Sequence, residues 1–188
     1  MTNRTAGYII SAVLLCAAIA SCSIFKKRIS HDPAPVTIKV NKTEKPASPV
    51  YKKSEAEILA DSLVAYAKTQ IGVKYRYGGS SPSGFDCSGL VVFSFSHFGI
   101  FVPRTSSAQY SSSERISASE IRTGDLVFFN GSHAGGTNVG HVAIITEVLG
   151  EGKFKMIHAT TQRGVCIDSF PEGSYYPPRL VGYGRVLR

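Results

Sequence analysis

In the segment Gly84-Phe85-Asp86-Cys87-Ser88-Gly89-Leu90-Val91, a glycine- and serine-rich loop meets an apolar run. The apolar positions continue to Phe98 and stop at Gly99, which predicts a buried helix that begins at the cysteine. A helix N-terminus has unpaired N–H groups and a partial positive charge, and both favour a thiolate. We therefore expect Cys87 to be a nucleophile of lowered pKa, with a core cysteine as the alternative.

Helical patterns also flank this stretch. Ser54-Glu55-Ala56-Glu57 is a capping-box sequence, and the apolar residues after it recur at helical spacing as far as Ile71, before Gly72. A third, short helix is expected over 105–112. The glycine- and serine-rich segment 75–85 is predicted to be a loop.

The second half of the body has a different pattern. Short apolar runs separated by turn residues predict strands at 126–129, 142–145, 154–157, 165–167 and 180–187. Helices followed by strands favour an α+β fold, with the N-terminal helices packed on an antiparallel sheet of about five to six strands. The spacing is too short for repeated βαβ units, which disfavours a doubly wound parallel sheet.

A cysteine nucleophile needs a neighbouring imidazole and a third group that orients this imidazole. His141 begins one apolar run and His158 ends another, so both are expected at the rim of the sheet. Each histidine alone is more typical of a satisfied structural residue. Together with Cys87 they form a candidate Cys–His–His set.

Two other uses of these residues stay open. One cysteine and two histidines assembled in space could bind zinc, although the sequence has no CxxC, HxxxH or HExxH spacing. An exported chain could also form a Cys87–Cys166 disulfide, which would remove the nucleophile. We expect no metal and no cofactor.

The front end of the chain has the features of an export signal. Arg4 precedes an apolar run over 8–20 that is too short to span a bilayer comfortably. The run closes with Ile19-Ala20-Ser21-Cys22, which resembles the bacterial lipobox and implies an acylated Cys22 at the start of the mature chain. An ordinary signal with an incidental cysteine is the alternative. We expect a lipoprotein signal peptide at 1–21.

The basic charge of the chain lies next to this signal. Residues 23–53 have eight basic and two acidic side chains, whereas residues 54–188 have twelve basic and eleven acidic ones. The body therefore has no excess of basic charge, which argues against nucleic-acid binding. Prolines, lysines and few large apolar residues predict that 22–53 is the lipidated cysteine with a flexible basic tether. The remaining 54–188 is one domain, expected to be a monomer.

Several ordered blocks resemble the NlpC family of bacterial cell-wall cysteine endopeptidases, in its single-domain lipoprotein form. The resemblance covers roughly 55–188. Its blocks are Tyr75-Arg76-Tyr77-Gly78-Gly79, the Asp86-Cys87-Ser88-Gly89 stretch, Pro103-Arg104-Thr105-Ser106, Thr123-Gly124-Asp125-Leu126, Gly140-His141-Val142-Ala143 and Ile157-His158-Ala159-Thr160.

The resemblance implies a papain-like fold and a role for each matched residue. Cys87 is implied as the nucleophile, His141 as the general base and acid, and His158 as the residue that orients His141. The Tyr75 hydroxyl is implied to help stabilise the oxyanion. The positions implied to contact substrate are Asp86, Ser88 and Arg76.

The implied substrate is the peptidoglycan stem peptide. The bond is the D-glutamyl–diamino acid bond or, as in some lipoprotein relatives with this layout, the D-alanyl cross-link. A lipid anchor would hold the enzyme in the cell envelope, outside the cytoplasmic membrane, and on the periplasmic face of the outer membrane in a Gram-negative cell. The alternatives are an amidase or acyltransferase on the same fold and a non-catalytic wall-binding lipoprotein.

Overall fold

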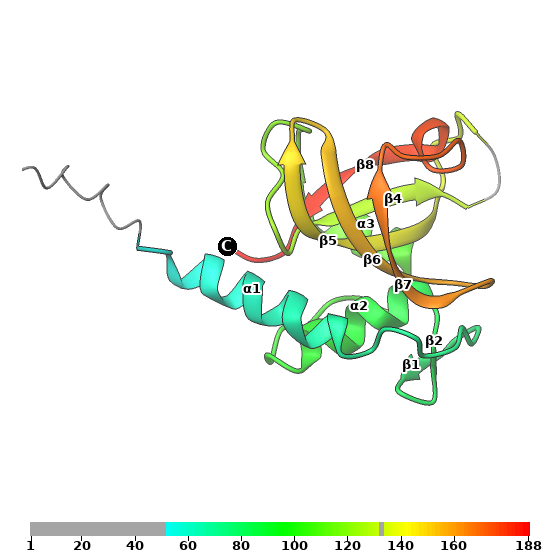
Figure 1. Ribbon diagram of the computed structural model, residues 1–188, viewed down its shortest axis with the longest axis horizontal. Coiled ribbons are helices and arrows are strands. Elements are labelled where there is room, and N and C mark those ends of the chain that lie inside the picture. The colour runs from blue at the N-terminus through cyan, green and yellow to red at the C-terminus, as the bar shows by residue number, and fades with distance from the viewer. Residues whose placement is uncertain (1–51, 132–133) are drawn as a thin grey trace, which may run out of the picture. The chain divides into compact units, whose positions relative to one another are not determined.

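Three helices pack with a six-stranded antiparallel sheet in the computed structural model, which describes residues 52–131 and 134–188 (Figure 1). The helices are α1 (Glu55–Lys68), α2 (Cys87–Ser96) and α3 (Ser106–Ser112). The sheet contains, in spatial order, β3 (Glu114–Ile116), β8 (Leu180–Arg185), β4 (Leu126–Asn130), β5 (Val139–Gly150), β6 (Lys153–Thr160) and β7 (Gly164–Phe170). The predicted α+β class and sheet size are confirmed. The predicted signal peptide, Cys22 and nearly all of the tether lie outside the described residues.

Helix α1 begins where the sequence predicts. The Ser54 side chain accepts a hydrogen bond from the Glu57 N–H at 3.3 Å, and the Glu57 carboxylate accepts one from the Ser54 N–H at 2.8 Å. This reciprocal pair satisfies two of the N–H groups that a helix start leaves unpaired. The buried face of the helix consists of Ala60, Leu63, Val64 and Ala67, which recur at helical spacing.

The predicted ends of α1 and α2, at Ile71 and Phe98, are wrong by three and two residues. Beyond each observed end the chain turns more tightly, with the Ile71 N–H bonded to the carbonyl of Lys68 and the Phe98 N–H to that of Phe95. These three-residue bonds close a tighter turn than the α-helix. The apolar periodicity continues through such a turn, so it did not reveal where each helix ends.

Helix α2 is the central helix, enclosed by α1 on one side and by β5 and β6 on the other (Figure 1). Its N-cap is Asp86, whose carboxylate accepts a hydrogen bond from the Gly89 N–H at 2.6 Å. Leu90, Val91 and Phe95 are fully enclosed. The predicted buried helix that begins at Cys87 is therefore confirmed.

The sheet has apolar residues on both faces. Along β5, Val142 and Ile144 belong to the core shared with the helices, whereas Ala143 and Ile145 belong to a second core on the opposite face. Successive side chains of a strand point to opposite faces. His141 therefore projects on the side of Ala143, at the end of the strand nearest to the start of α2.

Antiparallel register places the two candidate histidines near each other. Phe129 of β4 pairs with His141 of β5, and Ile144 of β5 pairs with Ile157 of β6. His158 of β6 pairs in turn with Cys166 of β7, which is an edge strand. The sheet thereby gathers polar side chains from three adjacent strands at one end.

The sequence did not predict three of the strands. A hairpin of β1 (Ser80–Ser81) and β2 (Gly84–Phe85) lies in the expected loop, and β3 pairs with β8 at the other edge of the sheet. These strands have two or three residues and little apolar alternation, so they give no periodic signal. Within the described part of the chain, no helix has the length and apolar character needed to cross a bilayer.

Candidate active site

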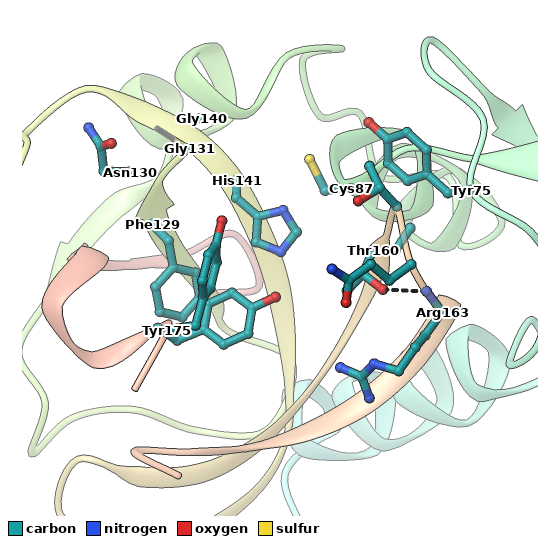
Figure 2. Close-up of a pocket in the computed structure, with 14 residues that line it drawn as sticks. Tyr75, Cys87, Phe129, Asn130, Gly131, Gly140, His141, Thr160, Arg163 and Tyr175 are labelled. Carbon is teal, nitrogen blue, oxygen red and sulfur yellow. Dashed lines mark hydrogen bonds between the residues drawn. The ribbon is translucent and has the colours of Figure 1, made fainter. Parts of the chain in front are cut away.

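A cavity of about 490 Å³ lies between the start of α2 and the adjacent ends of β4, β5 and β6. Tyr75, Cys87 and His141 line it, and Figure 2 shows the Cys87 sulfur and the His141 ring facing the same space. The turn between β6 and β7 closes one side, where Thr160 and Arg163 line the cavity. Three of the four residues implied to be catalytic therefore line one cavity, although 66 positions separate Tyr75 from His141.

Cys87 is the first residue of α2, with its sulfur toward the backbone of β5. Burial raises the pKa of its thiol, and the N–H groups of Val142 and Ser88, which oppose this shift, do not cancel it. The expectation of a lowered pKa is therefore wrong, because dehydration outweighs the helix start. The thiol is protonated at neutral pH and needs a base.

Asp86, one residue earlier, fastens the start of α2 to the loops around it. One of its oxygens accepts from the Gly89 N–H at 2.6 Å and the other from the Gly78 N–H at 3.0 Å. Arg104 donates to both oxygens, at 3.0 and 2.6 Å. Burial would raise the pKa of Asp86, but these hydrogen bonds and the guanidinium charge hold it below its ordinary value.

Asp86 does not line the cavity, and neither do Ser88 and Arg76, the other two residues implied to contact substrate. The Ser88 hydroxyl is buried, accepting from Arg104 at 2.9 Å and donating to Asp86 at 3.3 Å. Arg76 is exposed, and its backbone N–H bonds to the carbonyl of Phe85. Asp86 and Ser88 therefore hold the start of α2 and its neighbouring loops in place and do not face the cavity.

Behind His141 runs a line of three further side chains. His141 Nε2 lies 2.9 Å from His158 Nδ1, and His158 Nε2 lies 3.0 Å from Asp168 Oδ2. Arg163 donates to the same Asp168 oxygen at 2.6 Å. His158 is fully buried, whereas the Asp168 side chain is 20% exposed at the edge of the sheet.

When each ring has a single hydrogen, the hydrogen bonds of this line determine which nitrogen has it. An ionised Asp168 can only accept, so His158 Nε2 must have the hydrogen and His158 Nδ1 must be an acceptor. His141 Nε2 must then donate to it. The remaining nitrogen of His141, Nδ1, keeps its lone pair. This is the nitrogen available to take a proton from Cys87.

The shifted pKa values of His141 and Asp168 keep these hydrogen bonds in the direction just described. Burial, with the nearby His158, lowers the pKa of His141 to about 3, so its ring is neutral at physiological pH. The hydrogen bond from His158, together with the one from Arg163, holds the pKa of Asp168 well below its ordinary value. A neutral base therefore faces a protonated thiol.

Two tyrosines lie beside the reacting groups. The Tyr176 hydroxyl lies 3.4 Å from His158 Nδ1, and its ring stacks on His141 with centroids 5.9 Å apart. Burial and the nearby Cys87 raise the pKa of Tyr75, so its hydroxyl remains a hydrogen-bond donor. Tyr176 fixes the plane of the His141 ring, and Tyr75 offers a donor beside the sulfur.

Cys166 lies opposite His158 but does not line the cavity. Both Cys87 and Cys166 are free, so the alternative of a disulfide between them is wrong in this structure. Across residues 52–131 and 134–188, three side chains that could share a metal ion are His158, Cys166 and Asp168. This group differs from the zinc alternative built on Cys87 with the two histidines.

The sequence profile of the NlpC/P60 family matches residues 72–185. The chain belongs to the NlpC/P60 family. The probable endopeptidase p60 of Listeria welshimeri is 43% identical over 124 residues, which are 66% of this chain and 22% of that protein. The murein DD-endopeptidase MepS/murein LD-carboxypeptidase of Escherichia coli (strain K12) is 40% identical over 117 residues, 62% of this chain and 57% of that protein.

A solved structure supports the same assignment. The crystal structure of an NlpC/P60 family protein from Bacillus cereus ATCC 10987 superposes with a TM-score of 0.61 at 32% identity, over 69% of this chain and 40% of that chain. The predicted family and its papain-like fold are confirmed. The present chain spans between about a fifth and just over half of these relatives' lengths.

Besides Arg163, the fold places two residues at this site that the sequence analysis did not single out: Asp168 in the line and Tyr176 beside it. Asp168 is two residues after Cys166 in β7, and only the β6–β7 register shows that it reaches His158. Tyr176 precedes η1 (Pro177–Arg179) in a segment without a periodic pattern. Neither position had a local signal. The assembled site can deprotonate a thiol, hold the resulting imidazolium and stabilise an oxyanion.

Proposed function

We propose that this chain is a peptidoglycan endopeptidase that cleaves an amide bond of the stem peptide with Cys87 as its nucleophile. The observation behind the proposal is the unbroken line from His141 through His158 to Asp168, which leaves His141 Nδ1 as an acceptor toward the cavity that Cys87 shares. The names of the endopeptidase relatives agree with this reaction.

The reaction begins with proton transfer from the Cys87 thiol to His141 Nδ1. The sulfur attacks the carbonyl carbon, and the carbonyl π electrons move to the oxygen. The Cys87 N–H at the start of α2 and the Tyr75 hydroxyl donate to this oxyanion, and one such donor contributes about 3–4 kcal/mol in comparable sites. The C–N bond then breaks as the His141 imidazolium protonates the amine. Water, deprotonated by His141, hydrolyses the thioester and restores the thiol.

His158 and Asp168 act through His141 in this scheme. When His141 becomes an imidazolium, its Nε2–H continues to donate to His158, whose own Nε2–H donates to the Asp168 carboxylate. The negative charge two hydrogen bonds away stabilises the imidazolium without accepting its proton. Arg163 keeps that carboxylate ionised and in place.

Two stem-peptide bonds fit the chemistry: the D-glutamyl–diamino acid bond and the D-alanyl cross-link. Both lie close to free carboxylates, and the cationic residue Arg163 is among those that line the cavity. Of the other proposed substrate contacts, Arg76 is exposed and free to meet the peptide, whereas Asp86 and Ser88 would act by shaping the loop around Cys87.

We also propose that residues 1–21 are a lipoprotein signal, that Cys22 is acylated and that 22–53 is a tether. The enzyme would then work in the cell envelope, attached to a membrane outside the cytoplasm. Its partners would be the stem peptide and the membrane. Mass spectrometry of the exported protein tests this. A diacylglyceryl N-terminus at residue 22 supports the anchor, and an unmodified chain or a different N-terminus contradicts it.

Digestion of purified peptidoglycan tests the catalytic proposal. We expect mass spectrometry of the products to show new amino ends inside the stem peptide, and their position to identify the bond. The matched control is Cys87→Ala, which should retain the native circular dichroism spectrum and lose at least about 10⁴-fold in rate. Free lactoyl ends would instead indicate an amidase. Turnover by Cys87→Ala would remove Cys87 as nucleophile, and binding without turnover by the intact chain would indicate a wall-binding lipoprotein.

A further inference from the structure

We propose that His158, Cys166 and Asp168 form a binding site for a borderline-soft divalent cation, with Zn²⁺ as the reference ion, and that occupancy of this site disables the base His141. The binding stands on its own geometry, whereas the loss of activity rests on the function proposed above.

The β6–β7 register creates the ligand set. Cys166 lies directly opposite His158, and Asp168 follows two residues later on the same face of β7. One ligand atom from each residue lies within 4.8 Å of the other two. Zinc bond lengths of about 2.0–2.3 Å place ligands in a tetrahedral site about 3.3–3.8 Å apart. His158 Nε2 and Asp168 Oδ2 are already 3.0 Å apart, so it is the Cys166 sulfur that needs to approach the other two ligands, by about 1 Å.

The types of ligand select the kind of ion. Thiolate, imidazole and carboxylate together are typical of Zn²⁺ sites, and three protein ligands leave one position for water. Mg²⁺ and Ca²⁺ prefer oxygen ligands and should not compete. The same set should accept Co²⁺, whose thiolate complexes are visible by absorption.

The site can be reached from the edge of the sheet. Strand β7 is an edge strand, Cys166 is partly exposed and the Asp168 side chain is 20% exposed. The present cation at Asp168 is the guanidinium of Arg163, 2.6 Å away. The Arg163 side chain is 53% exposed, so it can swing into solvent when a metal ion replaces it.

Metal binding reverses the direction of the hydrogen bond between His158 and the base, His141. The hydrogen of His158 Nε2 leaves to solvent, the ion binds the lone pair that this frees, and Cys166 also releases its thiol proton to solvent. The hydrogen between the two rings moves from His141 Nε2 to His158 Nδ1, and His141 Nδ1 takes up a hydrogen from solvent. The neutral His158 ring must then have its hydrogen on Nδ1, which donates to His141 Nε2. His141 in turn must have its hydrogen on Nδ1, toward Cys87. Each ring keeps one hydrogen, but His141 no longer has a lone pair for the thiol proton.

The binding test uses the full chain with Cys87→Ala, because Cys87 with His141 could otherwise hold a metal by itself. We expect Co²⁺ to give a thiolate charge-transfer band, and Zn²⁺ to be taken from a chromophoric chelator. Adding Cys166→Ala should remove the band and weaken Zn²⁺ binding at least about tenfold. Adding Arg163→Gln should instead tighten it about threefold, because the competing cation is gone. A band that survives Cys166→Ala overturns the site.

The inhibition test uses wild type and Cys166→Ala, with Cys166→Ser as a second variant and thermal melting as the check of folding. We expect all three to hydrolyse at similar rates without metal, and Zn²⁺ but not Mg²⁺ to inhibit the wild type. Inhibition should weaken at least about tenfold in both variants. Equal inhibition of all three would place the metal at Cys87 and overturn the proposal. Binding without inhibition would overturn the coupling to His141. If the chain hydrolyses nothing, the proposed function fails while the Co²⁺ arm still decides the site.

Discussion

Two aspartate–arginine pairs support the reacting groups, one beside Cys87 and one behind His141, and they stabilise different parts of the site. Asp86 uses both oxygens, accepts two backbone N–H groups and is clamped by Arg104 on both sides. Asp168 uses one oxygen for His158 and Arg163 together, and its side chain is 20% exposed against 11% for Asp86. The first pair fixes the backbone at the start of α2, and the second fixes the position of the hydrogen on the His158 ring.

The comparison separates stability from catalysis within one site. The α2 side positions Cys87 through groups that are fixed when the chain folds. The sheet side positions the His141 lone pair through a chain of side-chain hydrogen bonds. Substitutions on the α2 side should therefore change the free energy of unfolding first, whereas those on the sheet side should change the rate first.

The largest effect on the sheet side is expected from His158→Ala. Without its ring, His141 Nε2–H has no acceptor and either nitrogen can face Cys87. We expect kcat/KM to fall about 10²-fold. His158→Gln, which keeps an amide oxygen for His141, should lose less. Steady-state hydrolysis of isolated stem peptides measures both, and a wild-type rate for His158→Ala would remove His158 from the site.

On the α2 side, Asp86→Ala should destabilise the fold by about 2 kcal/mol, since it removes a helix cap and the partner of Arg104. Arg104→Gln keeps the cap and loses the ion pair together with the hydrogen bond from Arg104 to the Ser88 hydroxyl. Because the arginine side chain is 40% exposed, about 1 kcal/mol is expected. Urea denaturation of the two variants measures the difference. Equal losses would mean that the cap to Gly89 contributes nothing, and the contrast between the two pairs would fail.

Asp168→Ala should have the opposite profile. We expect kcat to fall about tenfold with KM unchanged, because Asp168 does not line the cavity. The free energy of unfolding should change by less than about 1 kcal/mol, since the Arg163 side chain is 53% exposed. A rise in KM with unchanged kcat would assign Asp168 to substrate binding instead.

The sequence identified the α2 side better than the sheet side, for a physical reason. A capping box and an apolar run that follows a glycine- and serine-rich loop are local signals, so the starts of α1 and α2 could be predicted from neighbouring residues. Cys87, His141 and His158 stood in recognisable blocks. Asp168 reaches His158 only through the pairing of β6 with β7, and no local pattern states that register.

The same limit explains the wrong pKa prediction. A helix start can be seen in the sequence and argues for a thiolate at Cys87. The burial that outweighs it comes from residues distant in the chain, which pack around α2 only after folding. Long-range dehydration is therefore the quantity that the sequence could not provide.

The dependence of activity on pH sharpens the contrast at His141. Its pKa is lowered to about 3, and the base must be neutral to accept the thiol proton, so kcat/KM should stay level between pH 7 and pH 5. An imidazole with the ordinary pKa of about 6.5 would lose about 25-fold in kcat/KM over this range.

The protein should stay folded between pH 7 and pH 5, so that unfolding does not affect the measured rate. Carboxyls of lowered pKa, such as Asp86 and Asp168, add stability above about pH 4, and this stability is lost only below that value. Circular dichroism at each pH provides the control. A midpoint near pH 6.5 in a folded protein would mean that His141 is hydrated and that the line behind it does not keep it neutral.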